Sequence, residues 1–216
     1  MIEKLTPYKH IIWDWNGTLL NDLDLTLKAI NSQVKKFNLV MPTKDEHRKN
    51  FGFPIQDYYK RIGFDLENNC FKKIADEFVE EYFESFHTAD LFEGTKGLLE
   101  GLKYEGKLQS ILSASFQEHL DFALEKHGIR HFFENAFGIH HHLADSKVQR
   151  GLELIEKSHV PKNETLLIGD TDHDLEVGQE MGVEVLLVAD GHQSYERLKE
   201  LHHNVLETRF FSNDDL

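Results

Sequence analysis

Residues 10–22 read HIIWDWNGTLLND, an apolar run that ends in an aspartate and continues into a Gly-Thr turn. The pattern predicts a strand over about Ile11 to Trp13 that delivers Asp14 to the carboxyl end of a sheet, where open α/β folds bind their ligands. Two residues after Asp14, where a second carboxylate would complete an acid/base pair, the chain has Asn16. The chemistry of the site therefore depends on an amide at this position.

Strand-like and helix-like segments alternate in the second half of the chain. Because such alternation is typical of parallel strands joined by right-handed crossovers, we expect a parallel sheet with helices on both faces. The expected strands are Leu108–Ser113, Ala136–Ile139, Thr165–Gly169 and Val185–Val188, and the expected helices are Gly94–Tyr104, Gln117–His127, Ser146–Ser158 and Asp174–Met181.

The segment between these parts has a helical pattern throughout. Apolar residues at spacings of three and four predict a helix over Leu66–His87, and we expect further helices over Leu23–Val40, Asp45–Phe51 and Ile55–Ile62. No strand is expected from Asn21 to His87. The predicted fold class is therefore α/β: a Rossmann-like core of residues 1–19 and 89–216, with an inserted all-helical cap of residues 20–88.

Further polar motifs stand at the ends of the expected core elements. Ser113 closes an expected strand, Lys147 opens an expected helix, and Asp170 follows the apolar run LLIG of residues 166–169, with Asp174 four residues later. The carboxyl ends of parallel strands meet at one edge of a sheet, so we expect these side chains to lie close to Asp14.

In their order, the four motifs resemble those of the haloacid dehalogenase-like hydrolase superfamily, and within it the phosphoglycolate-phosphatase-like branch with a helical cap. The first motif of that family is D-x-D-G-T-[LV], and residues 14–19 of this chain read DWNGTL. The resemblance implies an aspartyl-phosphate formed on Asp14 and a bound Mg²⁺. The metal ligands it implies are Asp14, the backbone carbonyl of Asn16, and Asp170, with Asp174 orienting the metal waters or Lys147, or ligating directly.

The resemblance also implies how a phosphoryl group would be held. Ser113 would donate its hydroxyl, the backbone amides of Ala114 and Trp15 would lie nearby, and Lys147 would balance the negative charge of nucleophile and phosphate. The implied function is a Mg²⁺-dependent phosphohydrolase that acts on a small phosphorylated metabolite. Asp14, Asn16, Ser113 and Lys147 are its expected catalytic positions.

Asn16 departs from the family pattern. In the family, the second aspartate of the first motif protonates the leaving oxygen, and an amide cannot carry a proton. Such acid/base help is typically worth about 10²–10⁴-fold in rate. One outcome is a phosphatase that tolerates the amide, with good leaving groups or a substitute proton carrier such as Asp172, His173, Ser115 or a cap residue. The others are a phosphate sensor, an interaction protein on the same fold (a pseudo-phosphatase), and an engineered amide that traps an intermediate.

Two other chemistries of the superfamily agree less well with the residues. Haloacid dehalogenases carry an aromatic residue at the position of Asn16 and need no metal, whereas phosphonoacetaldehyde hydrolases use a cap lysine, for which Lys44 and Lys49 are the candidates here.

The expected substrate loop of the cap, residues 47–54, contains Arg48, which could bind a carboxylate or second phosphate bidentately. We expect no metal site at His140, His141 and His142, since acidic or cysteine partners at suitable spacing are absent.

Composition excludes several classes of partner. Lys and Arg number 24 and Asp and Glu number 38, and the net charge of −14 repels nucleic acid and anionic lipid. It would also repel a phosphorylated substrate, so a bound cation must reverse the sign locally. The single cysteine, Cys70, is consistent with a reducing compartment. No apolar run approaches a membrane span, so we expect a cytoplasmic protein.

Overall fold

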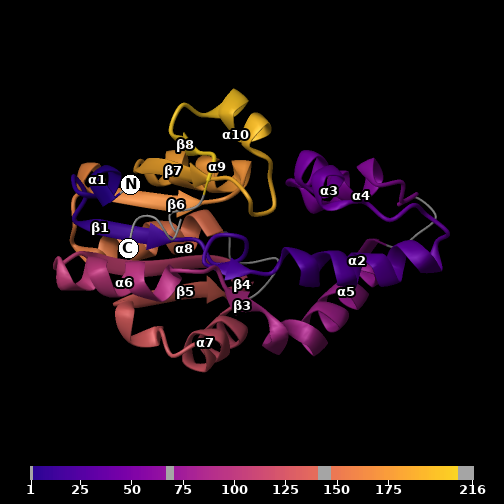
Figure 1. The fold of residues 1–216 in the computed structure, drawn as a ribbon, viewed down its shortest axis with the longest axis horizontal. Helices are drawn as coiled ribbons and strands as arrows, with labels where there is room; N and C mark the ends of the chain where they lie inside the picture. The colour runs from indigo at the N-terminus through magenta and orange to yellow at the C-terminus, as the bar shows by residue number, and fades with distance from the viewer. Residues whose placement is uncertain (1, 67–70, 141–146, 209–216) are drawn as a thin grey trace.

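The computed structural model describes residues 2–66, 71–140 and 147–208, and its centre is a six-stranded sheet in which every pair of neighbouring strands is parallel (Figure 1). The strand order is β5-β4-β1-β6-β7-β8. The strands are β1 (His10–Trp13), β4 (Leu108–Phe116), β5 (Asn135–Ile139), β6 (Thr165–Gly169), β7 (Glu184–Val188) and β8 (Val205–Leu206). The predicted fold class is confirmed.

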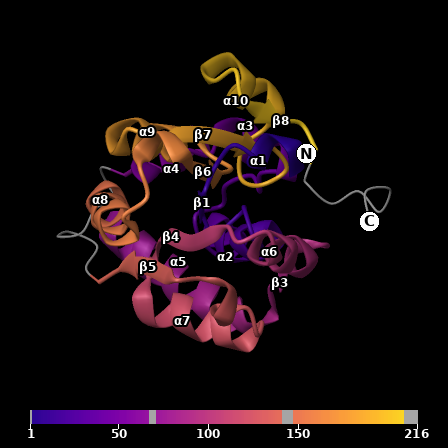
Figure 2. The same ribbon diagram turned by 90° about the vertical axis from the view of Figure 1, so that its left-hand side faces the viewer.

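Helices cover both faces of this sheet, because successive strand residues point to opposite sides. Ile11 and Trp13 of β1 belong to one buried apolar cluster and Ile12 to another. Figure 2 shows α8 and α9 on one side of the sheet and α1 and α6 on the other. The core helices are α1 (Ile2–Leu5), α6 (Thr95–Tyr104), α7 (Gln117–Lys126), α8 (Lys147–Ser158), α9 (Asp172–Met181) and α10 (Tyr195–Leu201), with 3₁₀ turns at Phe86–Thr88, Arg130–Phe132 and Lys162–Glu164.

Four helices between β1 and α6 form a separate group beyond the carboxyl ends of the strands (Figure 1). They are α2 (Leu23–Lys36), α3 (Lys44–Asn50), α4 (Ile55–Arg61) and α5 (Phe71–Ser85). The group has its own apolar core, in which Ile30 and Val34 of α2 pack against Tyr58, Tyr59 and Ile74. The helical segment thus has a core of its own, while Leu25 and Ala29 of α2 and Tyr82 of α5 belong to the apolar cluster of the sheet.

The expectation that no strand interrupts residues 21–87 is wrong at Asn21. Strands β2 (Leu20–Asn21) and β3 (Asp90–Leu91) pair antiparallel where the chain enters and leaves the helical group. Two-residue strands are too short to show a period in the sequence. The expected helix Leu23–Val40 also ends early, at Lys36, because Asn38 adopts a φ of 55° and the Leu39 amide bonds to the Val34 carbonyl at 2.9 Å, a C-terminal cap of the Schellman type.

Two smaller differences concern element ends. Helix α9 begins at Asp172 rather than Asp174, because Thr171 and Asp174 cap its first turn reciprocally. Helix α10 and strand β8 were not expected. Predictions that fall on Cys70, His141, His142 and Ser146 lie outside the described residues. In the part of the chain that the structure describes, no helix is both long enough and apolar enough to cross a membrane.

Candidate active site

Three aspartates meet at the carboxyl edge of the sheet. Asp14 directly follows β1, Asp170 directly follows β6, and Asp174 lies in the first turn of α9. All three are buried, and one carboxylate oxygen from each lies within 4.8 Å of the others. The structure thus brings together the three aspartates that the sequence analysis expected to lie close to one another.

Lys147, the first residue of α8, reaches into this cluster. Its Nζ donates to Asp14 Oδ1 and, at 2.6 Å, to Asp174 Oδ1. Burial opposes the charge of this lysine, but the two carboxylates raise its pKa above the usual range. Burial raises the pKa of the Asp14 carboxyl group, and Asp174 and Asp170 add to that rise against the effect of Lys147.

The charges of this cluster do not balance. Three carboxylates face one ammonium, so the ionised cluster carries a net charge of −2, which is costly in a buried site. A divalent cation with oxygen ligands would neutralise it, and Mg²⁺ prefers carboxylate and carbonyl oxygens. The donor set of Asp14, Asp170 and Asp174 therefore fits Mg²⁺.

The carboxylates are also held in place by their neighbours. Asp170 accepts from Thr18 Oγ1 at 3.1 Å and from the His192 amide at 2.6 Å. Gly17, at a φ of 72°, lies so close that a Cβ there would come within 2.3 Å of Asp170 Oδ2. Asp174 Oδ2 accepts from Thr171, while its Oδ1 accepts from Lys147. Each aspartate thus has a fixed orientation.

Asn16 belongs to a second polar group. Its Nδ2 donates to Asp22 Oδ2 at 2.9 Å and to Tyr82 Oη at 2.7 Å, and its Oδ1 accepts from Ser115 Oγ at 2.7 Å. The Asp22 carboxylate can only accept, so the amide nitrogen must face it. Both N–H bonds of the amide are therefore used.

Asp22 and His192 form a buried ion pair beside this amide. His192 Nε2 lies 3.2 Å from Asp22 Oδ1. Burial works against both charges, yet the His192 charge and hydrogen bonds from His192, Tyr82 and Asn16 lower the pKa of Asp22 to about 2. The Asp22 charge and its hydrogen bond likewise raise the pKa of His192 to about 9. The second group is thus neutral overall.

The second group continues into the helical segment. In His47 of α3, Nε2 lies 3.2 Å from His192 Nδ1, and Nδ1 lies 2.8 Å from Tyr58 Oη. Burial, together with the charge of His192, lowers the pKa of His47 to about 3. A neutral His47 can therefore link the ion pair to the core of the helical segment.

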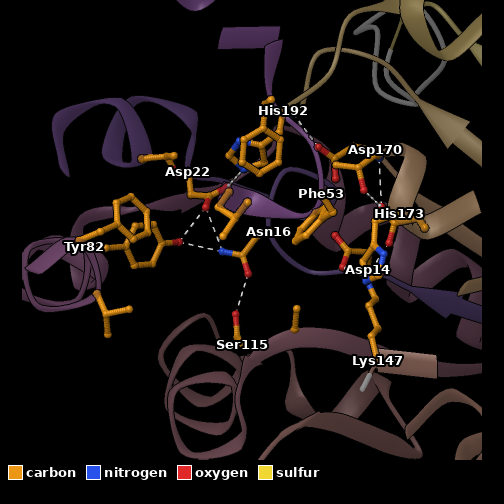
Figure 3. A pocket seen from close by; sticks show the side chains of 18 of the residues that line it. Asp14, Asn16, Asp22, Phe53, Tyr82, Ser115, Lys147, Asp170, His173 and His192 are labelled. Carbon is orange, nitrogen blue, oxygen red and sulfur yellow. Dashed lines mark hydrogen bonds and ion pairs between the residues drawn. The ribbon is translucent and has the colours of Figure 1, made fainter. Parts of the chain in front are cut away.

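A cavity of about 250 Å³ lies between the two groups and is lined by residues of both (Figure 3). Figure 3 shows Asp14, Lys147 and Asp170 on one side and Asn16, Asp22 and Tyr82 on the other. Ala114 and Ser115 line the cavity, whereas Ser113, Trp15 and Arg48 are not among the described lining residues. Ser113 Oγ accepts from the Ser115 amide at 3.0 Å.

Arg48, the expected substrate ligand, is engaged elsewhere. Its guanidinium donates to the carbonyls of Gly191 and Asp190, each at 3.1 Å. Lys44 forms an exposed ion pair with Asp24, and neither Lys44 nor Lys49 lines the cavity. The structure therefore gives no support to a Schiff-base lysine from these positions.

The candidate proton carriers are placed differently from one another. Asp172 pairs with Arg197 Nη2 at 2.5 Å and accepts from Gln193 at 2.7 Å, and it does not line the cavity. His173 does line it and packs against the Phe53 ring at 4.5 Å between centroids. Ser115 lines it but donates its hydroxyl to Asn16.

Sequence reasoning missed Asp22, Tyr82 and His192. One signal was available for His192, since the segment Ala189-Asp190-Gly191-His192 directly follows β7 at the same sheet edge. No comparable signal marks Asp22 or Tyr82, because an aspartate before a helix normally serves as a cap and a tyrosine at helical spacing as a core residue.

Comparisons with known proteins agree with the motifs. The model of a family described as haloacid dehalogenase-like hydrolase matches residues 11–188. The pyrophosphatase PpaX of Oceanobacillus iheyensis is 25% identical over 196 residues, covering 89% of this chain and 88% of the relative. A haloacid dehalogenase-like hydrolase from Streptococcus pneumoniae superposes with a TM-score of 0.73 at 18% identity, over 93% of each chain. A predicted phosphatase from Clostridium acetobutylicum gives a TM-score of 0.76 at 20% identity, over 96% of this chain and 95% of that one.

Proposed function

Because the chain belongs to the haloacid dehalogenase-like hydrolase family, we propose that it hydrolyses small phosphate monoesters with Mg²⁺, through an aspartyl-phosphate on Asp14. The observation that carries the proposal is the buried cluster of Asp14, Lys147, Asp170 and Asp174 at the carboxyl edge of the sheet. The pyrophosphatase name of the relative from Oceanobacillus iheyensis supports phosphoryl chemistry on this fold. We place the reaction in the cytoplasm.

In this proposal each residue of the cluster has a defined role, and Asp14 has two. An Asp14 carboxylate oxygen attacks phosphorus, and Lys147 holds that carboxylate and balances the charge that a phosphate adds. Asp14, Asp170, the Asn16 carbonyl and Asp174 would hold Mg²⁺, which when bound neutralises the substrate and cluster charges. Ser113 and the amides of Ala114 and Trp15 are proposed to hold the phosphoryl oxygens.

We propose residues 20–88 as a cap over the core of residues 1–19 and 89–216. Contacts across this division support the arrangement. Asn16 donates to Tyr82 Oη of α5 at 2.7 Å, Gln193 donates to the Phe51 carbonyl at 3.1 Å, and the Ser194 amide donates to the Arg48 carbonyl at 3.3 Å. A closed cap excludes water from the reacting groups.

The test is phosphate release from a panel of phosphate monoesters with Mg²⁺. We expect Asp14→Asn to lower turnover by about 10⁴-fold or more, because it removes the nucleophile. The matched control is Asp57→Asn, the same change at an aspartate of α4 that forms an exposed ion pair with Lys60, which should retain wild-type turnover. Equal turnover in wild type and Asp14→Asn would refute the proposal.

One observation favours a second candidate, a catalytically impaired phosphate-binding or interaction protein. Both N–H bonds of Asn16 are occupied by Asp22 and Tyr82, so this residue offers no donor to a leaving oxygen. Under this alternative the chain would bind phosphate and Mg²⁺ without turnover of any ester in the panel. It would also accumulate phosphate on Asp14 when given acetyl phosphate, which mass spectrometry of the intact chain would detect.

A further inference from the structure

The cavity in front of the carboxylate cluster has aromatic walls. Apart from the residues of the two polar groups, most of the described residues that line the cavity are apolar or aromatic (Figure 3). The helical segment supplies most of these side chains, and Phe53 packs over His173 at the cavity wall. The residues concerned are Phe51, Phe53, Phe78, Val79, Phe83 and Phe116. Such a surface binds flat apolar groups through burial and ring packing.

Among the described lining residues, no unpaired lysine or arginine is available to a second anionic group on the substrate. Among the described lining residues, Lys147 is the only lysine or arginine, and it belongs to the nucleophile. The charge of His192 is paired with Asp22. Arg48 and Arg197 are engaged outside the cavity, Arg48 with two backbone carbonyls and Arg197 with Asp172. The walls therefore disfavour carboxylate-bearing esters and pyrophosphate.

The second polar group sets a condition on the leaving group. Asn16 has no free N–H, and the Tyr82 hydroxyl donates to Asp22. A leaving oxygen therefore receives no proton from Asn16 or Tyr82, and this favours a leaving group that can depart as an anion. A phenol, with a pKa of about 10 as in tyrosine, leaves as an anion far more readily than an alcohol, whose pKa is close to the value of about 16 for water.

From these two observations we infer that the substrates are phosphate monoesters of phenols, with the aromatic ring held between the aromatic walls of the cap and β4. This inference rests on the proposed function. An Asp14 oxygen forms a bond to phosphorus as the bond from phosphorus to the aryl oxygen breaks, and the aryloxide leaves with the electron pair. The aryloxide takes a proton from solvent water after release.

The second half of the reaction restores the carboxylate. Water oxygen bonds to phosphorus, the bond from phosphorus to Asp14 breaks with its electrons on the carboxylate, and both water protons leave on the product as dihydrogen phosphate. No group at residue 16 is required to donate in the first half. An amide at residue 16 cannot take a proton from the attacking water, so we expect that attack to be the slower step for aryl esters.

The experiment compares kcat/KM of the full chain with Mg²⁺ for phenyl phosphate and cyclohexyl phosphate, which have the same number of carbon atoms but differ in ring planarity and leaving-group pKa. We expect phenyl phosphate to be favoured by about 10²-fold or more, the lower range of what a missing general acid costs. Pyrophosphate and phosphoglycolate should be poorer still. A preference for cyclohexyl phosphate or for either anionic substrate would overturn the inference.

A charge placed in the wall sharpens the test. Val79→Lys puts an ammonium among the lining residues, and we expect it to lower kcat/KM for phenyl phosphate and raise it for phosphoglycolate. The matched control is Val40→Lys, the same change at a side chain that is 86% exposed and outside the cavity. Equal substrate ratios in the two variants would contradict the wall assignment.

The failure of this inference is distinguishable from failure of the proposed function. Asp14-dependent phosphate release with the wrong preference overturns the inference alone. If no ester is turned over, titration calorimetry with Mg²⁺ compares phenylphosphonate with methylphosphonate. Tighter binding of phenylphosphonate, by about tenfold or more, supports the inference, and equal binding overturns it.

Discussion

The two polar groups that flank the cavity are built in opposite ways. The cluster of Asp14, Asp170, Asp174 and Lys147 has more negative than positive charge and needs a cation to become neutral. The group of Asn16 and Tyr82 with the Asp22–His192 pair is neutral, and both N–H bonds of its central amide are used. The first has the carboxylate ligands and the charge that would suit a metal ion, whereas the second joins the helical segment to the core, and the N–H bonds of its amide are all used.

The largest effect should follow from removing the single cation of the first cluster. Lys147→Met leaves three buried carboxylates facing one another, and we expect a loss of about 3–5 kcal/mol in the free energy of unfolding without Mg²⁺. Phosphate release should fall strongly as well. Urea unfolding with EDTA and with Mg²⁺ would measure the effect, and Mg²⁺ should stabilise the variant more than the wild type.

The control for this substitution is Lys72→Met, which removes an exposed lysine from α5. It should alter the free energy of unfolding by less than about 0.5 kcal/mol. If Lys147→Met and Lys72→Met unfold at the same urea concentration in EDTA, the charge imbalance assigned to the first cluster is wrong.

A smaller effect is expected from restoring a carboxyl group at residue 16. Asn16→Asp alone would set two carboxylates side by side, because Asp22 Oδ2 lies 2.9 Å from the amide nitrogen. In Asn16→Asp/Asp22→Asn the two side chains are exchanged and the total charge is unchanged. We expect the exchange to raise turnover of cyclohexyl phosphate by about 10²-fold, the lower range for general acid help, and the single substitution to raise it less.

Asp22→Asn is the control for the exchange, since it supplies no carboxyl group at residue 16 and should give no gain with cyclohexyl phosphate. The pH profile adds a second measurement. A gain with a new alkaline limb in kcat/KM, where the rate falls as the carboxyl group ionises, would identify a proton donor at residue 16. If the single and double substitutions gave equal gains, Asp22 would not restrain this position.

The difference between the two groups also explains what could be predicted from the sequence. Asp14, Ser113 and Asp170 follow apolar runs that read as strands, and parallel strands bring their carboxyl ends to one edge. The prediction of the first cluster therefore needed only element order. Asp22, Tyr82 and His192 come from a turn, a helix and a loop, and their meeting depends on how the helical segment lies on the core. No spacing within the chain encodes that contact.

The same reason accounts for the fold. Strands and helices with several apolar repeats were predicted within a few residues of their bounds. The β2–β3 pair and β8 were missed because these strands are two residues long and are defined by pairing with distant residues. The end of α2 at Lys36 depends on the left-handed conformation of Asn38, which the apolar pattern through Val40 conceals.

The smallest predicted effect concerns the pH dependence of stability. The pKa of His192 is about 9 in the folded chain and 6.5 is its usual value, so the folded state holds the proton more tightly. Its contribution is therefore complete below pH 6.5 and is lost as the pH rises toward 9. Between pH 6.5 and 8 the free energy of unfolding should fall by about 1.5 kcal/mol.

His192→Gln would isolate that contribution. In the variant the fall between pH 6.5 and 8 should be absent. Neutral His47, whose pKa is lowered to about 3, changes its contribution over this range by less than about 0.5 kcal/mol and in the opposite direction. Urea unfolding of both proteins at pH 6.5, 7.2 and 8 would measure the slope. A variant that loses stability as steeply as the wild type over this range would show that His192 does not hold its proton through Asp22. The second group would then be joined by neutral hydrogen bonds alone.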